Sequence, residues 1–351
     1  MIPIYKPFMP DNIVTELNEI LHSSQLNYGK HGRLFEFQLS QFLTSEYVLT
    51  TNSYNTAINI VLSTIGLQYG DEIIASPVGC LASAQPFVTK GLKIIWADIN
   101  PDTGTLCPID VESKVTLKTK AIFHNHFCGY LGEINKINEI GNKYSISIID
   151  DGIEAFGSEY NGKKLGNLGT DFTIFSFQTV RLPNTIEGGA IVFKSKDLYE
   201  KAKLIRDYGI DRSIFRTVDG EINPECDIQL EGYGGLMSEI NSFIGIKQML
   251  FIEELLNKQR LNAIKWQIEL QNNIEIKSLA VNKNTKPNYW VYGTLSANKN
   301  EIIKYFKSKG YYATSVHINL NIYSVFNNKI KLPGVDKFIK QFVAIPCGWW
   351  V

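Results

Sequence analysis

Hydrophobic and polar positions along this chain predict short buried strands separated by helices. Apolar residues recur at helical spacing in residues 11–22, 33–43 and 57–65. Short apolar runs at 47–51, 93–97, 120–124 and 147–149 predict strands, and each run is followed by a helical stretch. This order is typical of a parallel sheet whose strands are joined by crossover helices.

The second half of the chain begins with the same pattern and then changes. Residues 173–177 and 190–193 predict strands on either side of a polar loop, and helices are expected at 196–207, 240–250 and 251–270, with a loop at 213–231. From about residue 271 the segments become short and β-rich, with one helix at 300–309. We therefore expect an α/β fold with a large domain, residues 1–250, built on a mainly parallel central sheet. A small C-terminal α+β domain, residues 251–351, follows it.

Composition narrows the functional classes. The 351 residues contain 35 Lys and Arg and 35 Asp and Glu, so the net charge is zero. A nucleic-acid or membrane-surface partner usually requires a basic excess, so neither is expected. The five cysteines are scattered without metal-ligand spacing, which predicts reduced thiols, no metal site and a cytoplasmic location. The first residues show no signal peptide, and no transmembrane span is expected.

Two polar segments are candidates for chemistry. The loop between the strands at 173–177 and 190–193 ends in Glu187 and a glycine pair, and glycine lets the backbone approach a ligand closely. Residues 52–56, Asn-Ser-Tyr-Asn-Thr, precede a helix, where free N–H groups form an anion site. A plain helix cap is the alternative for this second segment.

The loop at 176–189 resembles the active-site loop of the DegT family of sugar-nucleotide aminotransferases. Those are fold-type I enzymes that depend on pyridoxal phosphate (PLP), and a lysine holds the cofactor as a Schiff base. Arg181 stands at that lysine position. Further matches follow in the family's order at 126–129, 151–157, 232–239 and 316–317. The resemblance covers nearly the whole chain and implies a homodimer that binds a nucleotide sugar.

The resemblance also implies roles for individual residues. Asp151 would pair with the pyridine nitrogen, and Glu154 would lie beside the ring. The remaining cofactor positions are Asn55, Tyr54, Cys80, Ser176 and Gln178, and the substrate positions are Glu187 and His317. His126 matches a family landmark, with a structural histidine as the alternative to a catalytic one.

Four positions depart from the family pattern: Arg181, Tyr54, Cys80 and Gly234 replace the lysine, a glycine, a stacking aromatic and an asparagine. Arginine stays protonated, so it cannot form an aldimine. Tyr54 would crowd the site or fill it. We therefore expect PLP or pyridoxamine phosphate (PMP) to bind non-covalently if at all.

Three hypotheses remain open. The first is a nucleotide-sugar-modifying enzyme that uses Glu154, Asp151 and His126, with Arg181, for acid–base chemistry. The second is a PLP- or PMP-dependent transaminase or dehydratase with compensating residues. The third is a non-catalytic partner of an active paralogue. Surface-polysaccharide sugar biosynthesis, such as that of O-antigen, is the setting that the resemblance implies. In one family branch a further helix follows the last matched motif, so this chain is either truncated or lacks that helix naturally.

Overall fold

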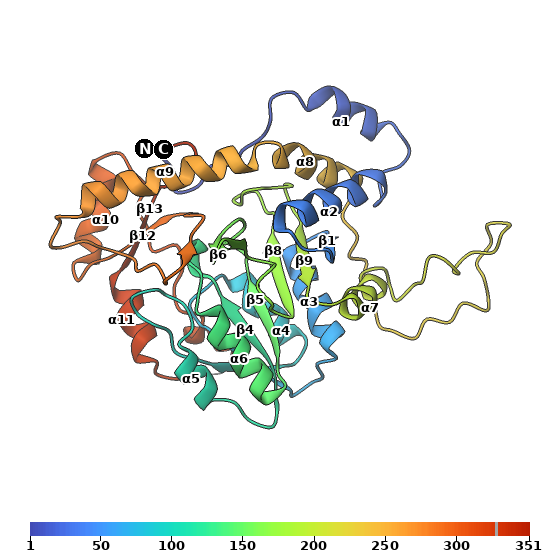
Figure 1. The fold of residues 1–351 in the computed structure, drawn as a ribbon, viewed down its shortest axis with the longest axis horizontal. Helices are drawn as coiled ribbons and strands as arrows, with labels where there is room; N and C mark the ends of the chain where they lie inside the picture. The colour runs from blue at the N-terminus through green and yellow to red at the C-terminus, as the bar shows by residue number, and fades with distance from the viewer. Residues whose placement is uncertain (327–328) are drawn as a thin grey trace.

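The computed structural model describes residues 1–326 and 329–351 and is organised around a seven-stranded sheet (Figure 1). Its strand order is β1-β9-β8-β5-β4-β2-β3. Neighbours from β8 to β3 pair in parallel, whereas β9 pairs antiparallel with both β8 and β1. Within this sheet β9 alone runs against the rest, so the predicted mainly parallel sheet is confirmed. The strands are β1 (Val48–Thr51), β2 (Glu72–Ala75), β3 (Lys93–Trp96), β4 (Thr119–Asn125), β5 (Ser147–Asp151), β8 (Phe172–Ser176) and β9 (Gly189–Phe193).

Helices cover both faces of this sheet. The neighbours Ile73 and Ile74 of β2 belong to different apolar clusters, as do Ile148 and Ile149 of β5. Successive side chains of a strand point to opposite faces, so both faces are apolar, as crossover helices require. The helices of this part are α1 (Val14–Leu21), α2 (Lys30–Leu43), α3 (Tyr54–Ile65), α4 (Leu81–Thr89), α5 (Pro108–Ser113), α6 (Ile134–Tyr144), α7 (Lys196–Arg206) and α8 (Glu239–Met249), with a 3₁₀ turn η1 (Phe127–Gly129).

Helix α3 begins earlier than its apolar pattern indicated. The side chain of Ser53 caps the helix by accepting a hydrogen bond from the backbone N–H of Thr56 at 3.1 Å. The first helical residue is therefore Tyr54, not Ala57. This shift turns Tyr54 from a turn residue into one whose side chain is fixed by the helix backbone.

The C-terminal part forms a second, smaller α+β unit. Helix α9 (Ile252–Leu270) leads into the antiparallel sheet β10-β12-β13, which packs with α10 and α11. A third small sheet pairs β11 with β6 of the first part, so chain segments from both parts are joined there. The elements are β6 (Glu159–Tyr160), β7 (Lys163–Lys164), β10 (Lys277–Ser278), β11 (Thr285–Lys286), β12 (Tyr292–Leu295), α10 (Lys299–Ser308), η2 (Leu320–Ile322), η3 (Ser324–Phe326), α11 (Pro333–Gln341) and β13 (Phe342–Ile345). The exact domain boundary after residue 250 stays a prediction.

The segment between α7 and α8 contains no helix and extends away from the rest of the molecule (Figure 1). Its apolar side chains Val218 and Ile222 are exposed. In the described ranges, none of the helices combines the length and apolar character that crossing a membrane requires.

Candidate functional site

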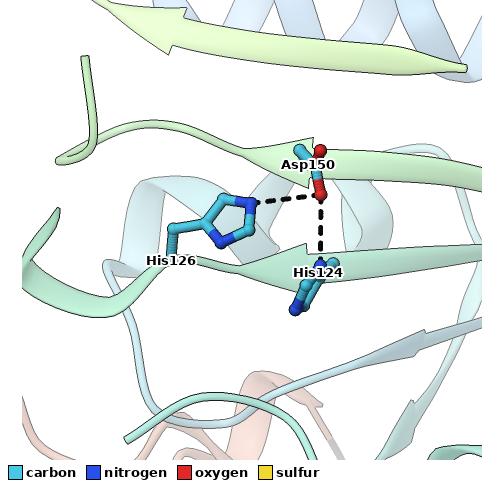
Figure 2. A group of neighbouring side chains, drawn as sticks. All are labelled: His124, His126 and Asp150. Carbon is cyan, nitrogen blue, oxygen red and sulfur yellow. Dashed lines mark hydrogen bonds and ion pairs between the residues drawn. The ribbon is translucent and has the colours of Figure 1, made fainter. Parts of the chain in front are cut away.

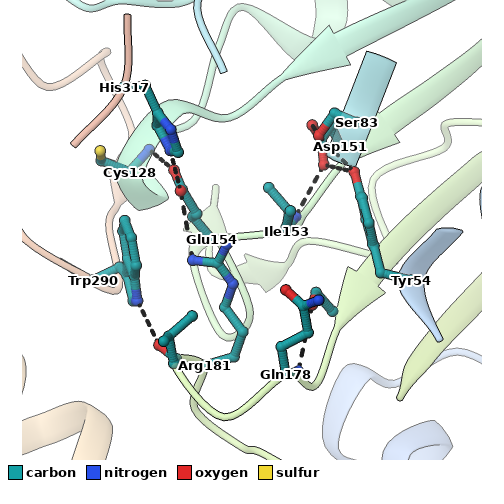
Figure 3. A network of polar contacts seen from close by, with 12 residues as sticks. Tyr54, Ser83, Cys128, Asp151, Ile153, Glu154, Gln178, Arg181, Trp290 and His317 are labelled. Carbon is teal, nitrogen blue, oxygen red and sulfur yellow. Dashed lines mark hydrogen bonds and ion pairs between the residues drawn. The ribbon is translucent and has the colours of Figure 1, made fainter. Parts of the chain in front are cut away.

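The carboxyl ends of β5 and β8 bring the predicted site residues together. Asp151 is the last residue of β5, Glu154 lies in the turn after it, and Ser176 ends β8. Because β5 and β8 are parallel neighbours, their C-terminal ends meet at one edge of the sheet. Open α/β sheets place ligand sites at this edge. Figure 3 shows that the polar contacts of Asp151 and those of Glu154 form two separate groups.

At Asp151 the hydrogen-bonding capacity is filled by neutral donors. The Tyr54 hydroxyl donates to Asp151 Oδ1 at 2.6 Å, and the Ser83 hydroxyl donates to Oδ2 at 2.8 Å. The backbone N–H of Ile153 also donates to Oδ1, at 3.1 Å. Tyr54 is fully buried. Burial raises the pKa of Asp151, and these hydrogen bonds oppose that shift without reversing it.

At Glu154 the donors are instead mainly charged or chargeable groups. His317 Nε2 lies 2.8 Å from Glu154 Oε1, and the backbone N–H of Cys128 donates to Oε2 at 2.8 Å. Arg181 places its guanidinium NH1 3.5 Å from Oε1. Burial would raise the pKa of this carboxyl. The charge and hydrogen bond of His317, the charge of Arg181 and the backbone hydrogen bond from Cys128 outweigh it and lower the pKa to about 2. Glu154 is therefore a buried, ionised carboxylate.

Arg181 is held by an aromatic side chain from the C-terminal part. Its guanidinium carbon lies 4.5 Å from the centre of the Trp290 ring, and its side chain is only 6% exposed. The Trp290 indole N–H also donates to the backbone oxygen of Val180 at 3.0 Å, which fixes the loop on the N-terminal side of Arg181. Among the described residues, the groups bonded to Asp151 and Glu154 include no lysine.

The other predicted cofactor residues and Glu187 contact nearby groups of the protein. The Asn55 amide donates to the backbone oxygen of Ala82 at 3.0 Å, and Cys80 is the N-cap residue of α4. Burial raises the pKa of the Cys80 thiol. The Ser176 hydroxyl accepts from the backbone N–H of Gln178 at 3.4 Å, and the Gln178 amide reaches the exposed Glu187 at 3.4 Å. None of these contacts joins Asp151 to Glu154.

The structure does not bring His126 into this network. Its ring lies 3.1 Å from Asp150, the neighbour of Asp151 whose side chain points to the other face of β5, and His124 contacts the same carboxylate at 3.1 Å (Figure 2). All three side chains are fully buried. The N–H of Gly132 donates to His126 Nδ1, so Nε2 carries the proton in the neutral ring. Nε2 lies within ion-pair distance of Asp150 Oδ1 but has no hydrogen-bond partner among the described residues. The three residues have the composition of a metal site, but His126 offers no free lone pair to an ion.

The two groups differ in their access to solvent. Beside Asp151 the structure leaves a cavity of about 10 Å³, bounded by Cys80, Ser83 and Phe123 among others. His317 lines an open cavity of about 310 Å³, together with polar side chains such as Thr314, Ser315 and Tyr323. A cavity of about 880 Å³ lies between α2 and α7 and contains neither carboxylate. The candidate site is therefore the Glu154 side of the network.

Sequence reasoning missed three contributors to this network. Trp290 lies in a segment without a recognisable motif. Ser83 lies three residues after Cys80, and only Cys80 was predicted to be a site residue in that segment. Cys128 contributes only a backbone N–H. A backbone donor or a stacking tryptophan carries no local sequence signal. These contacts emerge only when distant segments meet.

Comparison with known proteins matches this geometry to one family. Residues 8–349 match the model of the DegT/DnrJ/EryC1/StrS aminotransferase family. The sugar aminotransferase CalS13 from Micromonospora echinospora superposes with a TM-score of 0.94 at 25% identity, covering 100% of this chain and 96% of that one. PseC of Helicobacter pylori, an aminotransferase involved in the biosynthesis of pseudoaminic acid, gives a TM-score of 0.88 at 25% identity, covering 98% of this chain and 93% of that one. A pleiotropic regulatory protein of Geobacillus stearothermophilus is 26% identical over 97% of this chain and 90% of its own length. The resemblance and the fold-type I aminotransferase fold are confirmed.

Proposed function

Because the chain belongs to the DegT/DnrJ/EryC1/StrS aminotransferase family, we propose that it acts on a nucleotide sugar by proton transfer. In this proposal no lysine-bound aldimine forms, since Arg181 stands at the lysine position. The substrate class is taken from relatives that are sugar aminotransferases. A keto- or amino-sugar nucleotide is the expected ligand, and isomerisation or dehydration of the sugar is the expected reaction.

The observation that carries this proposal is the contact between His317 and Glu154. The imidazole lines the open cavity of about 310 Å³, while the carboxylate behind it is buried and ionised. An imidazole that is oriented by a carboxylate can accept a proton and stabilise the resulting imidazolium. We therefore assign proton transfer to His317 and regard Glu154 as the residue that positions it.

An isomerisation at this site balances without another reactant. His317 takes a proton from the carbon next to a keto group, and the electron pair moves to the carbonyl oxygen to form an enolate. A proton then moves from the hydroxyl on the deprotonated carbon to the former carbonyl oxygen. His317 returns its proton to the former carbonyl carbon, which gives the isomeric keto sugar. The reaction needs no oxidant, no reductant and no amino donor.

Arg181 supports this arrangement as a fixed cation. Its guanidinium stacks on Trp290 and remains within ion-pair distance of Glu154. A guanidinium stays protonated at every working pH, so Glu154 keeps its negative charge when His317 changes its protonation state. Asp151 has no such neighbour and contributes structure rather than proton transfer in this proposal.

Solvent exchange tests the proposal directly. The full chain is first melted with a panel of nucleoside-diphosphate keto- and amino-sugars, because a ligand that binds the native state raises the melting temperature. The sugars that stabilise the protein are then incubated with it in D₂O and followed by NMR. We expect deuterium at the carbon next to the keto group, and His317→Gln should lower its rate of incorporation at least about 100-fold.

A matched control is available elsewhere in the chain. His22 is exposed and its ring contacts only the backbone oxygen of Asn18 in the described structure. His22→Gln should exchange deuterium at the wild-type rate. Stabilisation by a nucleotide sugar with no exchange in the wild-type protein would overturn the assignment of proton transfer to His317.

A non-catalytic partner of an active paralogue is the second candidate. The observation that favours it is that both buried carboxylates are paired within the chain, and one relative is described as a pleiotropic regulatory protein. In this case no sugar of the panel would be turned over, and the chain would co-purify with an active family member. We place either function in surface-polysaccharide sugar biosynthesis, in a cytoplasmic homodimer or a mixed dimer.

A further inference from the structure

The Tyr54 hydroxyl fills a hydrogen-bonding position on the Asp151 carboxylate from within the same chain. Its hydroxyl lies 2.6 Å from Oδ1 of Asp151 and 3.0 Å from the hydroxyl of Ser83, which serves Oδ2. Burial raises the pKa of Tyr54 well above its ordinary value, and the neighbouring carboxylate raises it further. Tyr54 therefore keeps its proton and acts as a permanent donor. In the family that this chain resembles, the ring nitrogen of the cofactor is the donor to this carboxylate.

The space beside Asp151 is too small for a cofactor ring. The cavity there measures about 10 Å³, which is close to the minimum for a single water molecule. Ligand and cofactor pockets usually measure about 300–1,000 Å³. The fully buried Tyr54 side chain, itself a six-membered ring with a polar end, hydrogen-bonds Asp151 and Ser83, which both line this cavity.

The groups at the positions expected to hold the aldehyde and the phosphate of the cofactor also have partners within the chain. Arg181 has no nucleophilic amine, and its guanidinium is stacked on Trp290 and paired with Glu154. The Asn55 amide, which stands in the predicted phosphate-binding turn, donates to the backbone oxygen of Ala82. At the pyridine, aldimine and phosphate positions alike, these residues do not fit pyridoxal phosphate.

We infer that this chain excludes PLP and PMP because Tyr54 takes the place of the cofactor's ring nitrogen at Asp151. Such a chain retains the family's carboxylate and supplies its hydrogen-bond donor internally. The inference holds for both candidate functions, because it concerns only the Asp151 side of the network. Its test is therefore independent of nucleotide-sugar turnover.

The first experiment uses the wild-type full chain. Equilibrium dialysis against PLP and against PMP, with a thermal melt in parallel, should show less than about 0.1 mole of cofactor per chain and no stabilisation. Stoichiometric binding that Asp151→Asn weakens at least tenfold would overturn the inference. Stoichiometric binding that Asp151→Asn leaves unchanged would place the cofactor away from Asp151 and would also overturn the inference that this chain excludes it.

The second experiment reopens the site in two matched double variants. Tyr54→Gly with Arg181→Lys removes the ring and supplies an amine, whereas Tyr54→Phe with Arg181→Lys supplies the same amine but keeps the ring. After incubation with PLP, borohydride reduces an imine to a stable secondary amine, which peptide mass spectrometry detects. We expect the adduct on the peptide containing position 181 in the glycine variant, and at least tenfold less of it in the phenylalanine variant.

Each outcome of the second experiment bears on Tyr54. Equal labelling of both folded variants, or labelling of neither, would mean that the Tyr54 ring is not the barrier and would overturn the inference. If the glycine variant does not fold, the dialysis result for the wild-type chain decides alone. Deuterium exchange on a nucleotide sugar is measured separately, so failure of the proposed function would leave this result unchanged.

Discussion

Asp151 and Glu154 are two buried carboxylates three residues apart, and they differ in almost every other respect. Asp151 is bonded to hydroxyl groups and a backbone N–H, and only about 10 Å³ of space lies beside it. Glu154 is bonded to His317, Arg181 and a backbone N–H, and His317 opens to a cavity of about 310 Å³. One carboxylate is sealed by the protein, and the other is connected to solvent through an imidazole.

The difference shows that burial alone does not determine the state of a carboxyl group. Burial raises the pKa of both residues, but the net pKa of Asp151 is raised and that of Glu154 is lowered. Neutral hydroxyl donors oppose the cost of burying a charge only in part, whereas cations outweigh it. The partner set therefore makes one residue a structural anchor and the other an ionised centre suited to chemistry.

The largest expected effect comes from removing the cation beside Glu154. Arg181→Ala should lower the free energy of unfolding by about 4 kcal/mol, because it leaves a buried carboxylate with one charge partner fewer and removes the stacking on Trp290. Urea denaturation measures this loss. Arg212 pairs with Asp207 at a side chain that is 56% exposed, so Arg212→Ala should cost less than about 1 kcal/mol. Equal losses in the two variants would contradict the ion-pair interpretation.

The pH dependence of stability should have opposite signs at the two carboxylates. The folded pKa of Glu154 is about 2, below the ordinary 4.5, so its contribution is complete above pH 4.5 and is lost as the pH falls towards 2. The gap in unfolding free energy between wild type and Glu154→Gln should shrink over that interval by up to about 3 kcal/mol. Urea denaturation from about pH 2.5 to pH 7 measures it.

Asp151 provides the comparison for the same titration. Its folded pKa is raised above the ordinary 3.8, so its contribution is complete below pH 3.8 and decreases as the pH rises through the raised value. The difference in unfolding free energy between wild type and Asp151→Asn should therefore shrink as the pH rises, whereas the difference for Glu154→Gln shrinks as the pH falls. If both differences in unfolding free energy changed in the same direction with pH, the contrast between the two carboxylates would be refuted.

Removing the Tyr54 hydroxyl should have a smaller effect than removing Arg181. Tyr54→Phe keeps the ring and takes one donor from Asp151, which costs about 2 kcal/mol for a hydrogen bond to a buried, ionisable carboxyl group. Tyr69 is 89% exposed, so Tyr69→Phe should change stability by less than about 0.5 kcal/mol in the same assay. A loss at Tyr54 no larger than at Tyr69 would mean that this hydroxyl does not stabilise Asp151.

The smallest effect is expected at Ser83. Ser83→Ala removes the donor to Asp151 Oδ2 but enlarges the cavity of about 10 Å³ that Ser83 lines, so a water molecule can replace the hydroxyl. We expect a loss of about 1 kcal/mol, measured by urea denaturation. The exposed Ser113 bonds a backbone oxygen, and Ser113→Ala serves as the control with a change below about 0.5 kcal/mol.

The sequence by itself determined the elements and the order of the motifs. The periodicity of apolar residues predicted β4, β5 and β8 to within a few residues. The departures from the family pattern at Tyr54 and Arg181 stay predictions. Such signals are local, because hydrophobic period and turn chemistry are properties of a short stretch of chain.

Only the tertiary structure decided which side chains meet. Tyr54 and Asp151 are 97 residues apart, and His317 and Glu154 are 163 residues apart. Their contacts depend on the strand order that places β5 between β4 and β8 and on the packing of the C-terminal part against that edge. His126 contacts Asp150 and not Asp151, because neighbouring residues of a strand point to opposite faces of the sheet.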